Sequence, residues 1–154
     1  MTAQQARQKI YKYCAYQERC HQEVEEKLRS FYLPDDQIEE IISHLIQEGF
    51  LNEERYARFF VAGKFRLKNW GRLKIRHELE QKNVSKHCIK AGLNEIIEED
   101  YQQCIQKLLS KKAEQLDEVN IFVLRDKVAS SVIAKGFEPE LVWTLTKKMF
   151  PDKR

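Results

Sequence analysis

Glycine and proline are scarce in this 154-residue chain, with five and three residues respectively. Sheets and barrels need turn residues at short intervals, whereas tightly connected helices do not, so this scarcity favours an all-helical fold. No apolar run approaches the roughly 18 residues of a membrane span, and the first residues lack the apolar core of a signal peptide. We therefore expect a cytoplasmic protein that forms one compact domain or a short array of small units.

Signatures of catalytic, cofactor or metal chemistry are also missing. The four cysteines form no CxxC pair, and we expect them to be reduced and mostly buried. The adjacent pairs Cys20–His21 and His87–Cys88 diverge by about 100° on a helix and do not reproduce the spacing of zinc ligands. The glycines are too dispersed to form a phosphate-binding loop. The sequence thus predicts no enzyme, no cofactor and no bound metal.

What the chain does contain is an internal repeat of about fifty residues. One apolar series recurs at an offset of 51 residues and again after a further 53, and seventeen of the eighteen positions are apolar. Within a series, a spacing of four residues keeps neighbouring members on one helix face, and two successive spacings of five residues mark a turn. The three series are Val24, Leu28, Leu33, Ile38, Ile42 and Leu45; Ile75, Leu79, Val84, Ile89, Leu93 and Ile96; and Val128, Val132, Phe137, Val142, Thr146 and Met149.

Each repeat has a characteristic residue at its turn. Tyr32, Asn83 and Gly136 hold the equivalent position just before the apolar turn residue. Asparagine and glycine tolerate the left-handed conformation that ends many helices, whereas tyrosine fits it less well. The next helix is expected to begin two residues later in each repeat.

A further helix precedes each helix pair, so each repeat should hold three helices. We predict an all-α fold of three tandem three-helix repeats, at residues 1–52, 53–99 and 100–154. A unit this small buries too little apolar surface alone, so the repeats should stack into an elongated, curved array. The third repeat should differ by a longer, charged connection at residues 110–120.

Charge is distributed very unevenly along the chain. Residues 55–82 hold nine Lys or Arg against two Glu, a balance of +7, while residues 1–54 carry −5 and residues 83–154 carry +1. A single exposed cation is usually solvated or paired with a helical neighbour. That interpretation does not account for nine cations against two anions. The segment therefore indicates a surface for phosphates or for an acidic protein.

The candidate contact residues are the nine cations and the tryptophan of this basic segment. They are Arg55, Arg58, Lys64, Arg66, Lys68, Trp70, Arg72, Lys74, Arg76 and Lys82. Tyr56, Phe60 and Leu67 have helical spacing and are interpreted as a core-facing stripe. Two alternatives stay open for Trp70, which could pack at a helix junction or stack on a base.

Two stretches of the middle repeat carry a resemblance to a known family. GFLNEERYARFFV at Gly49–Val61 and WGRLKIRHELEQK at Trp70–Lys82, with the three tandem units, resemble the RecX family of bacterial regulators of the RecA recombinase. The resemblance spans essentially the whole chain and is most specific in the middle repeat. Asn83 stands where the family usually has glycine, and Asn52–Glu53 where it often has two aspartates.

The resemblance implies a non-enzymatic protein that binds RecA filaments, in their groove or as a cap on growth. Such a protein restrains recombinase, ATPase and coprotease activities, and so modulates DNA repair, recombination and the SOS response. The expected partners are the RecA filament and single- or double-stranded DNA, with no membrane contact. We expect a monomer whose acidic residues 1–54 are repelled by DNA and whose basic segment faces it.

The residues alone leave two other functions open. One is a sequence-nonspecific DNA-binding helical protein, because three-helix units resemble helix-turn-helix modules. The other is a helical scaffold for a different partner. A DNA reader would be expected to carry a basic face in at least two repeats, whereas here the charge is concentrated in one.

Overall fold

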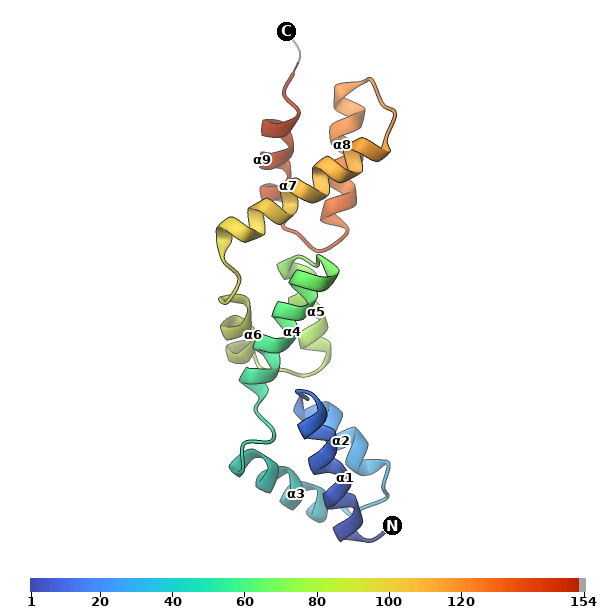
Figure 1. Cartoon of the computed structure of the whole chain (residues 1–154), viewed down its shortest axis with the longest axis vertical. Coiled ribbons are helices and arrows are strands. Elements are labelled where there is room, and N and C mark those ends of the chain that lie inside the picture. Colours follow the sequence, from blue (N-terminus) through green and yellow to red (C-terminus); the bar gives the residue numbers. More distant parts are fainter. Residues whose placement is uncertain (153–154) are drawn as a thin grey trace. The chain divides into compact units, whose positions relative to one another are not determined.

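The computed structural model describes residues 1–152, and every regular element in this range is an α-helix. The nine helices of the described range are α1 (Ala3–Tyr16), α2 (His21–Arg29), α3 (Asp35–Gln47), α4 (Glu53–Lys68), α5 (Arg72–Gln81), α6 (Lys86–Leu93), α7 (Glu98–Gln115), α8 (Ile121–Ile133) and α9 (Pro139–Met149) (Figure 1). The all-α prediction is confirmed. None of the helices within residues 1–152 combines the length and the apolarity that a bilayer span requires.

The turn position of each predicted repeat adopts left-handed backbone geometry. The φ angles of Tyr32, Asn83 and Gly136 are 59°, 59° and 96°. At each position the N–H donates to the carbonyl three residues earlier, over 2.9 to 3.0 Å. Tyr32 adopts this conformation although tyrosine fits it poorly, with its side chain 94% exposed. The next helices begin after Pro34, Ser85 and Glu138, two residues beyond each turn residue, as the repeat predicts.

The apolar series that define the repeat lie in the interior. Fourteen of their eighteen residues are buried, and the other four are half-buried. The one polar member, Thr146, is fully buried. Its hydroxyl donates to the carbonyl of Val142, one turn earlier on α9, over 2.7 Å. A threonine fits this core position because its own helix satisfies the hydroxyl.

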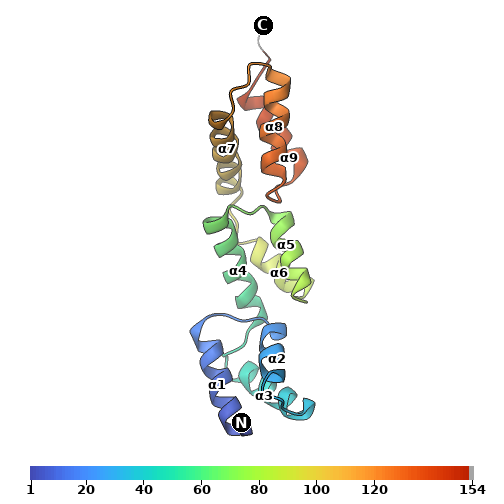
Figure 2. The same cartoon turned by 90° about the vertical axis from the view of Figure 1, so that its right-hand side faces the viewer.

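The described residues form two compact units, and α4 and α5 each contribute one half to each unit. The first unit holds residues 1–61 and 78–93. In it, α1, α2 and α3 lie side by side (Figure 2). Their shared core is centred on Ile10, Val24, Leu28 and Leu45, all fully buried.

The second unit holds residues 62–77 and the chain from residue 94 onward. Here α7, α8 and α9 lie side by side (Figures 1 and 2). They enclose a core around Tyr101, Ile105, Leu109 and Phe137, all fully buried. Phe65, from the second half of α4, packs against this core. The candidate residues from Lys64 to Arg76 therefore belong to the same unit as α7 to α9.

The connection between α7 and α8 is shorter than predicted. Helix α7 continues to Gln115, so residues 110–115 of the expected connection are helical and only residues 116–120 link the two helices. The helical part consists mostly of Lys, Ala, Glu and Gln, which are good helix formers, and has no Gly or Pro. Asn120 then caps α8, where its side-chain oxygen accepts from the N–H groups of Phe122 and Val123 over 2.9 and 3.2 Å.

Candidate functional site

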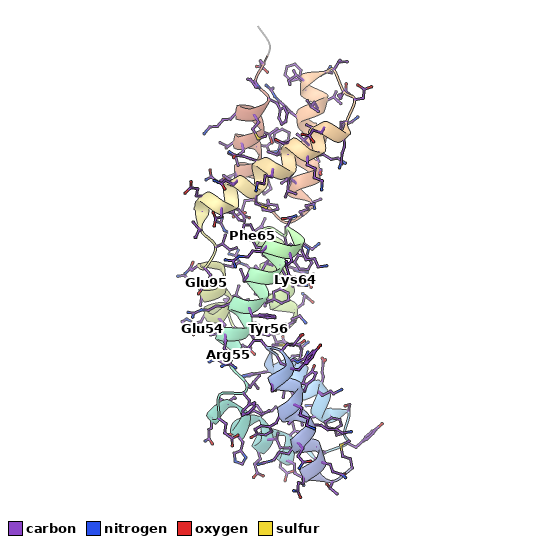
Figure 3. All side chains as sticks on the ribbon, viewed as in Figure 1. Glu54, Arg55, Tyr56, Lys64, Phe65 and Glu95 are labelled. Atoms are coloured by element: carbon purple, nitrogen blue, oxygen red, sulfur yellow. The ribbon has the colours of Figure 1, made fainter. Side chains whose placement is uncertain are left out.

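The basic segment consists of α4, the turn at residues 69–71 and α5. Three of its cations lie in the first unit and pair with carboxylates there. Arg55 Nε is 2.6 Å from Glu18 Oε1, and Lys82 Nζ is 3.9 Å from Glu23 Oε2. Arg58 pairs within α4 with the carboxylate one turn earlier, at 3.3 Å. Arg55 lies at the start of α4 (Figure 3). Part of the charge of these three residues is therefore neutralised inside the chain.

Arg72 opens α5 and is the centre of a polar cluster in the second unit. Its guanidinium lies over the Tyr101 ring, with Cζ 3.8 Å from the ring centroid. Nη1 donates to Glu138 Oε2 over 2.9 Å, and Nη2 pairs with Glu98. The Arg72 N–H donates to the Tyr101 hydroxyl oxygen over 3.0 Å, and that hydroxyl donates to Glu138. Arg72 is only 22% exposed, so it does not lie on the open basic face that its charge predicts.

The ionisation states in this cluster follow from its contacts. Burial acts to raise the pKa of Glu138, but hydrogen bonds from Tyr101 and Arg72 outweigh it, and the pKa is lowered. A hydrogen bond from Gln102, followed by one from Arg72, lowers the pKa of Glu98. Burial is the largest cause that raises the pKa of Tyr101. At neutral pH the cluster thus holds one cation, two carboxylates and a protonated phenol.

The start of α5 meets the turn between α8 and α9 through its backbone. The N–H of Gly71 donates to the Lys135 carbonyl, and the N–H of Leu73 donates to the Gly136 carbonyl, both over 2.9 Å. A Cβ on Gly71 would lie 2.3 Å from backbone atoms of Gly136 and Phe137. Glycine is thus required at position 71 by close backbone approach. These contacts position Arg72 and its neighbours on α5.

Trp70 is half-buried between two lysines of the second unit. Lys64 Nζ from α4 lies 4.8 Å from its ring centroid, and Lys74 Nζ from α5 lies 4.3 Å away. Both distances are within the range of cation–π attraction. Of the two alternatives for Trp70, packing within the chain is supported by these contacts. Stacking on a base stays a prediction.

Three further cations of the basic segment face solvent. Arg66, Lys68 and Arg76 are exposed. Within the described range no carboxylate lies within 4.0 Å of any of them. Their charge is consequently available to a partner, unlike that of Arg55, Arg72 or Lys82.

Sequence reasoning missed two lysines that join this surface. A groove of about 410 Å³ lies between the end of α4 and α7 in the second unit. Arg66 lines it from α4, and Lys107 and Lys111 line it from α7. The two lysines are one turn apart on α7, which is the only signal that the sequence offered. That spacing could not show that α7 lies beside α4.

The core-facing stripe predicted along α4 is right for Tyr56 and Phe60 and wrong for Leu67. Tyr56 is 4% exposed and Phe60 is half-buried, whereas Leu67 is 82% exposed. Phe65 lies near the end of α4 (Figure 3) and takes the inward position there. Its ring centroid is 5.8 Å from that of Tyr101. Leu67 lies two residues on, about 200° around the helix, and so points to solvent.

Other groups that could carry chemistry are inert or dispersed. The four cysteines are free, and burial raises the pKa of the Cys14 and Cys20 thiols to about 11. A buried thiol with a raised pKa is a poor nucleophile. Residues 1–152 contain no group of three His, Cys, Asp or Glu side chains placed to hold a metal ion.

Two family models match the chain, one after the other. The model of the first three-helix domain of RecX matches residues 6–45, and that of the second three-helix domain matches residues 52–93. The two matches cover 40 and 42 residues, together just over half of the 154. The chain belongs to the RecX family. The resemblance found in the sequence is thus confirmed.

Individual RecX proteins extend this similarity along the chain. The "Regulatory protein RecX" of Bacillus cytotoxicus is 28% identical over 141 residues, which cover 92% of this chain and 52% of that protein. The protein of the same name from Lactococcus lactis subsp. cremoris is 29% identical over 128 residues, covering 81% and 48%. This RecX-family chain thus spans about half the length of the curated relatives it matches. The crystal structure of RecX from Lactobacillus salivarius has the same fold, with a TM-score of 0.88 at 24% identity over 96% of both chains.

Proposed function

We propose that this chain binds the RecA–DNA filament and restrains the recombinase, ATPase and coprotease activities of RecA without catalysing a reaction itself. Membership of the RecX family is the observation that carries the proposal. The described residues support it, because they offer an exposed basic surface at Arg66, Lys68 and Arg76. As a monomeric regulator of this kind, the protein would modulate DNA repair and recombination.

The basic segment contacts nucleic acid through its solvent-facing members. Lys68 and Arg76 are exposed and have no carboxylate within 4.0 Å in the described range, so phosphates can neutralise them without breaking an internal ion pair. Trp70, with Lys64 and Lys74 at its ring, adds an aromatic surface beside two ammonium groups. Arg55, Arg58, Arg72 and Lys82 contribute less, because each already pairs with a carboxylate.

The acidic residues 1–54 contact recombinase protomers rather than DNA. Their balance of −5 opposes approach to phosphates, whereas the +7 of residues 55–82 favours it. A molecule that holds more than one protomer would slow filament exchange by contact alone. A cryo-EM map of the complex with residues 1–54 against nucleic acid would contradict this arrangement.

The decisive measurement is RecA ATP hydrolysis on single-stranded DNA at increasing amounts of the purified chain. Filament control predicts inhibition well below one molecule per RecA protomer. Inhibition that requires stoichiometric amounts would instead indicate simple competition for DNA. No effect at any ratio, with binding of neither filament nor DNA, would leave only the scaffold alternative.

A matched pair of variants tests the role of the exposed cations. Lys68→Gln with Arg76→Gln removes two contacts, which corresponds to about 25-fold weaker single-strand binding at 0.1 M salt. Lys147→Gln with Lys148→Gln removes the same charge from two exposed positions of α9 and should have little effect. Equal losses in both variants would show that only net charge matters.

A further inference from the structure

The groove between α4 and α7 carries cations that the described protein does not use internally. Arg66 on α4 and Lys107 and Lys111 on α7 line it, and all three are exposed. Asp100 is the only acidic residue that lines the groove, and among residues 1–152 no carboxylate lies within 4.0 Å of the three cations. The three cations therefore form no direct ion pair within the described residues, and they outnumber the one carboxylate of the groove.

The remaining groove residues suit a phosphodiester strand. The side-chain amides of Asn69 and Gln103 are uncharged and supply N–H donors for phosphate oxygens. Phe65 and Leu108 add apolar surface beside them. Lys107 and Lys111 are four residues apart, a rise of about 6 Å along α7, so they present charge along the groove rather than at one point. Such a combination holds a backbone without reading its sequence.

Cys104 is half-buried and also lines the groove. Its thiol donates to Asn69 Oδ1 over 3.7 Å, which orients that amide. Burial raises the pKa of Cys104, and the nearby charges of Lys107 and Lys135 oppose this rise.

We infer that this groove is a binding site for the backbone of single-stranded DNA, held by Arg66, Lys107 and Lys111. The site deepens the DNA contact of the proposed function and extends it from the basic segment to α7. Arg66 also belongs to the basic segment, so a strand in the groove would join that segment to α7. The basic surface then contains cations from two predicted repeats, residues 53–99 and 100–154, rather than from one. An acidic protein segment is the competing occupant, and the measurements below separate the two.

The test is binding of a fluorescently labelled oligothymidine to the full chain at several salt concentrations, without recombinase. Replacing Arg66, Lys107 and Lys111 together by Gln removes three phosphate contacts. The slope of log affinity against log salt should then fall by about 2, and affinity at 0.1 M salt should fall on the order of a hundredfold. The control replaces Lys90, Lys147 and Lys148 by Gln, which removes the same charge from exposed positions outside the groove. It should change affinity less than about threefold.

Equal losses in the two triple variants, or an unchanged salt slope in the groove variant, would overturn the inference. Loss of binding to labelled polyglutamate, with oligothymidine binding retained, would assign the groove to an acidic protein instead. If the triple variant fails to fold, Lys111→Gln and Lys111→Arg serve in its place. The first should lose about fivefold in affinity and the second should retain it. Oligothymidine binding without any effect on RecA would refute the proposed function and leave the groove site standing.

Discussion

Replacing Gly71 by alanine should loosen the contact between the start of α5 and the α8–α9 turn. A Cβ at this position would lie 2.3 Å from the backbone carbon of Gly136 and from the backbone nitrogen of Phe137. Ordinary van der Waals contact begins at 3.4 Å, so these atoms must separate by roughly 1 Å. Because the obstacle is backbone rather than a flexible side chain, no rotamer change relieves it.

The expected loss can be worked out from the contacts that this separation breaks. The bonds from Gly71 N–H to Lys135 and from Leu73 N–H to Gly136 are both 2.9 Å long, and a shift of about 1 Å ends them as hydrogen bonds. Two such bonds contribute about 1–3 kcal/mol. Displacement of the fully buried Phe137 adds about 1 kcal/mol or more. We expect Gly71→Ala to lower the free energy of unfolding of this unit by about 2–4 kcal/mol.

Both tryptophans, Trp70 and Trp143, belong to the second unit, so tryptophan fluorescence during urea unfolding reports on that unit alone. The fluorescence midpoint of Gly71→Ala should fall by about 1–2 M urea. The matched control is Gly63→Ala in α4, where an added Cβ meets nothing within 4 Å. It should raise stability by about 0.5–1 kcal/mol, because alanine is the better helix former.

The same substitution, made at two positions eight residues apart, should therefore change the free energy of unfolding in opposite directions. If Gly71→Ala proved neutral or stabilising like Gly63→Ala, the close backbone contact between α5 and the α8–α9 turn would be wrong. A drop in the far-UV circular dichroism midpoint without a matching drop in fluorescence would place the damage outside the second unit.

Three further predictions concern single residues. Arg72→Ala should lower the free energy of unfolding by about 1–3 kcal/mol, because Glu138 loses its cationic partner and keeps only the Tyr101 hydroxyl. Arg72→Lys should not restore the stability, since one ammonium cannot bind both carboxylates and cover Tyr101. Full fluorescence-monitored stability of the lysine variant would refute this. Tyr32→Gly should raise the free energy of unfolding by about 0.5–1 kcal/mol, because a φ of 59° strains tyrosine and the 94% exposed side chain packs on little. The thermal midpoint should rise with it, and a lower midpoint would contradict this. Glu98 and Glu138 have lowered pKa values in the folded state, so their contribution to the free energy of unfolding should be present above pH 4.5 and be lost as the pH falls below it. Fluorescence-monitored urea titrations should show this loss in wild type and a smaller loss in Glu138→Gln.

Much of the fold was predictable because its signals are local. A helix face repeats every three to four residues, and a left-handed cap needs only its own few neighbours, so the apolar series and the turns at Asn83 and Gly136 could be read along the chain. Even Thr146, the polar exception, lies in the core position that its repeat assigns. The balance of +7 at residues 55–82 was equally visible, because net charge needs no geometry.

The role of each cation was decided only by tertiary structure. Arg72 and Glu138 are 66 residues apart, and nothing near Arg72 in the sequence indicates that two distant carboxylates and Tyr101 surround it. Lys107 and Arg66 line the same groove only because α7 packs beside α4, which the sequence around either residue does not indicate. The sequence by itself determined the helices, their repeat and the amount of charge. Which charges are neutralised and which remain exposed depended on the packing of distant helices, since an ion pair requires two groups to meet within a few ångströms in space.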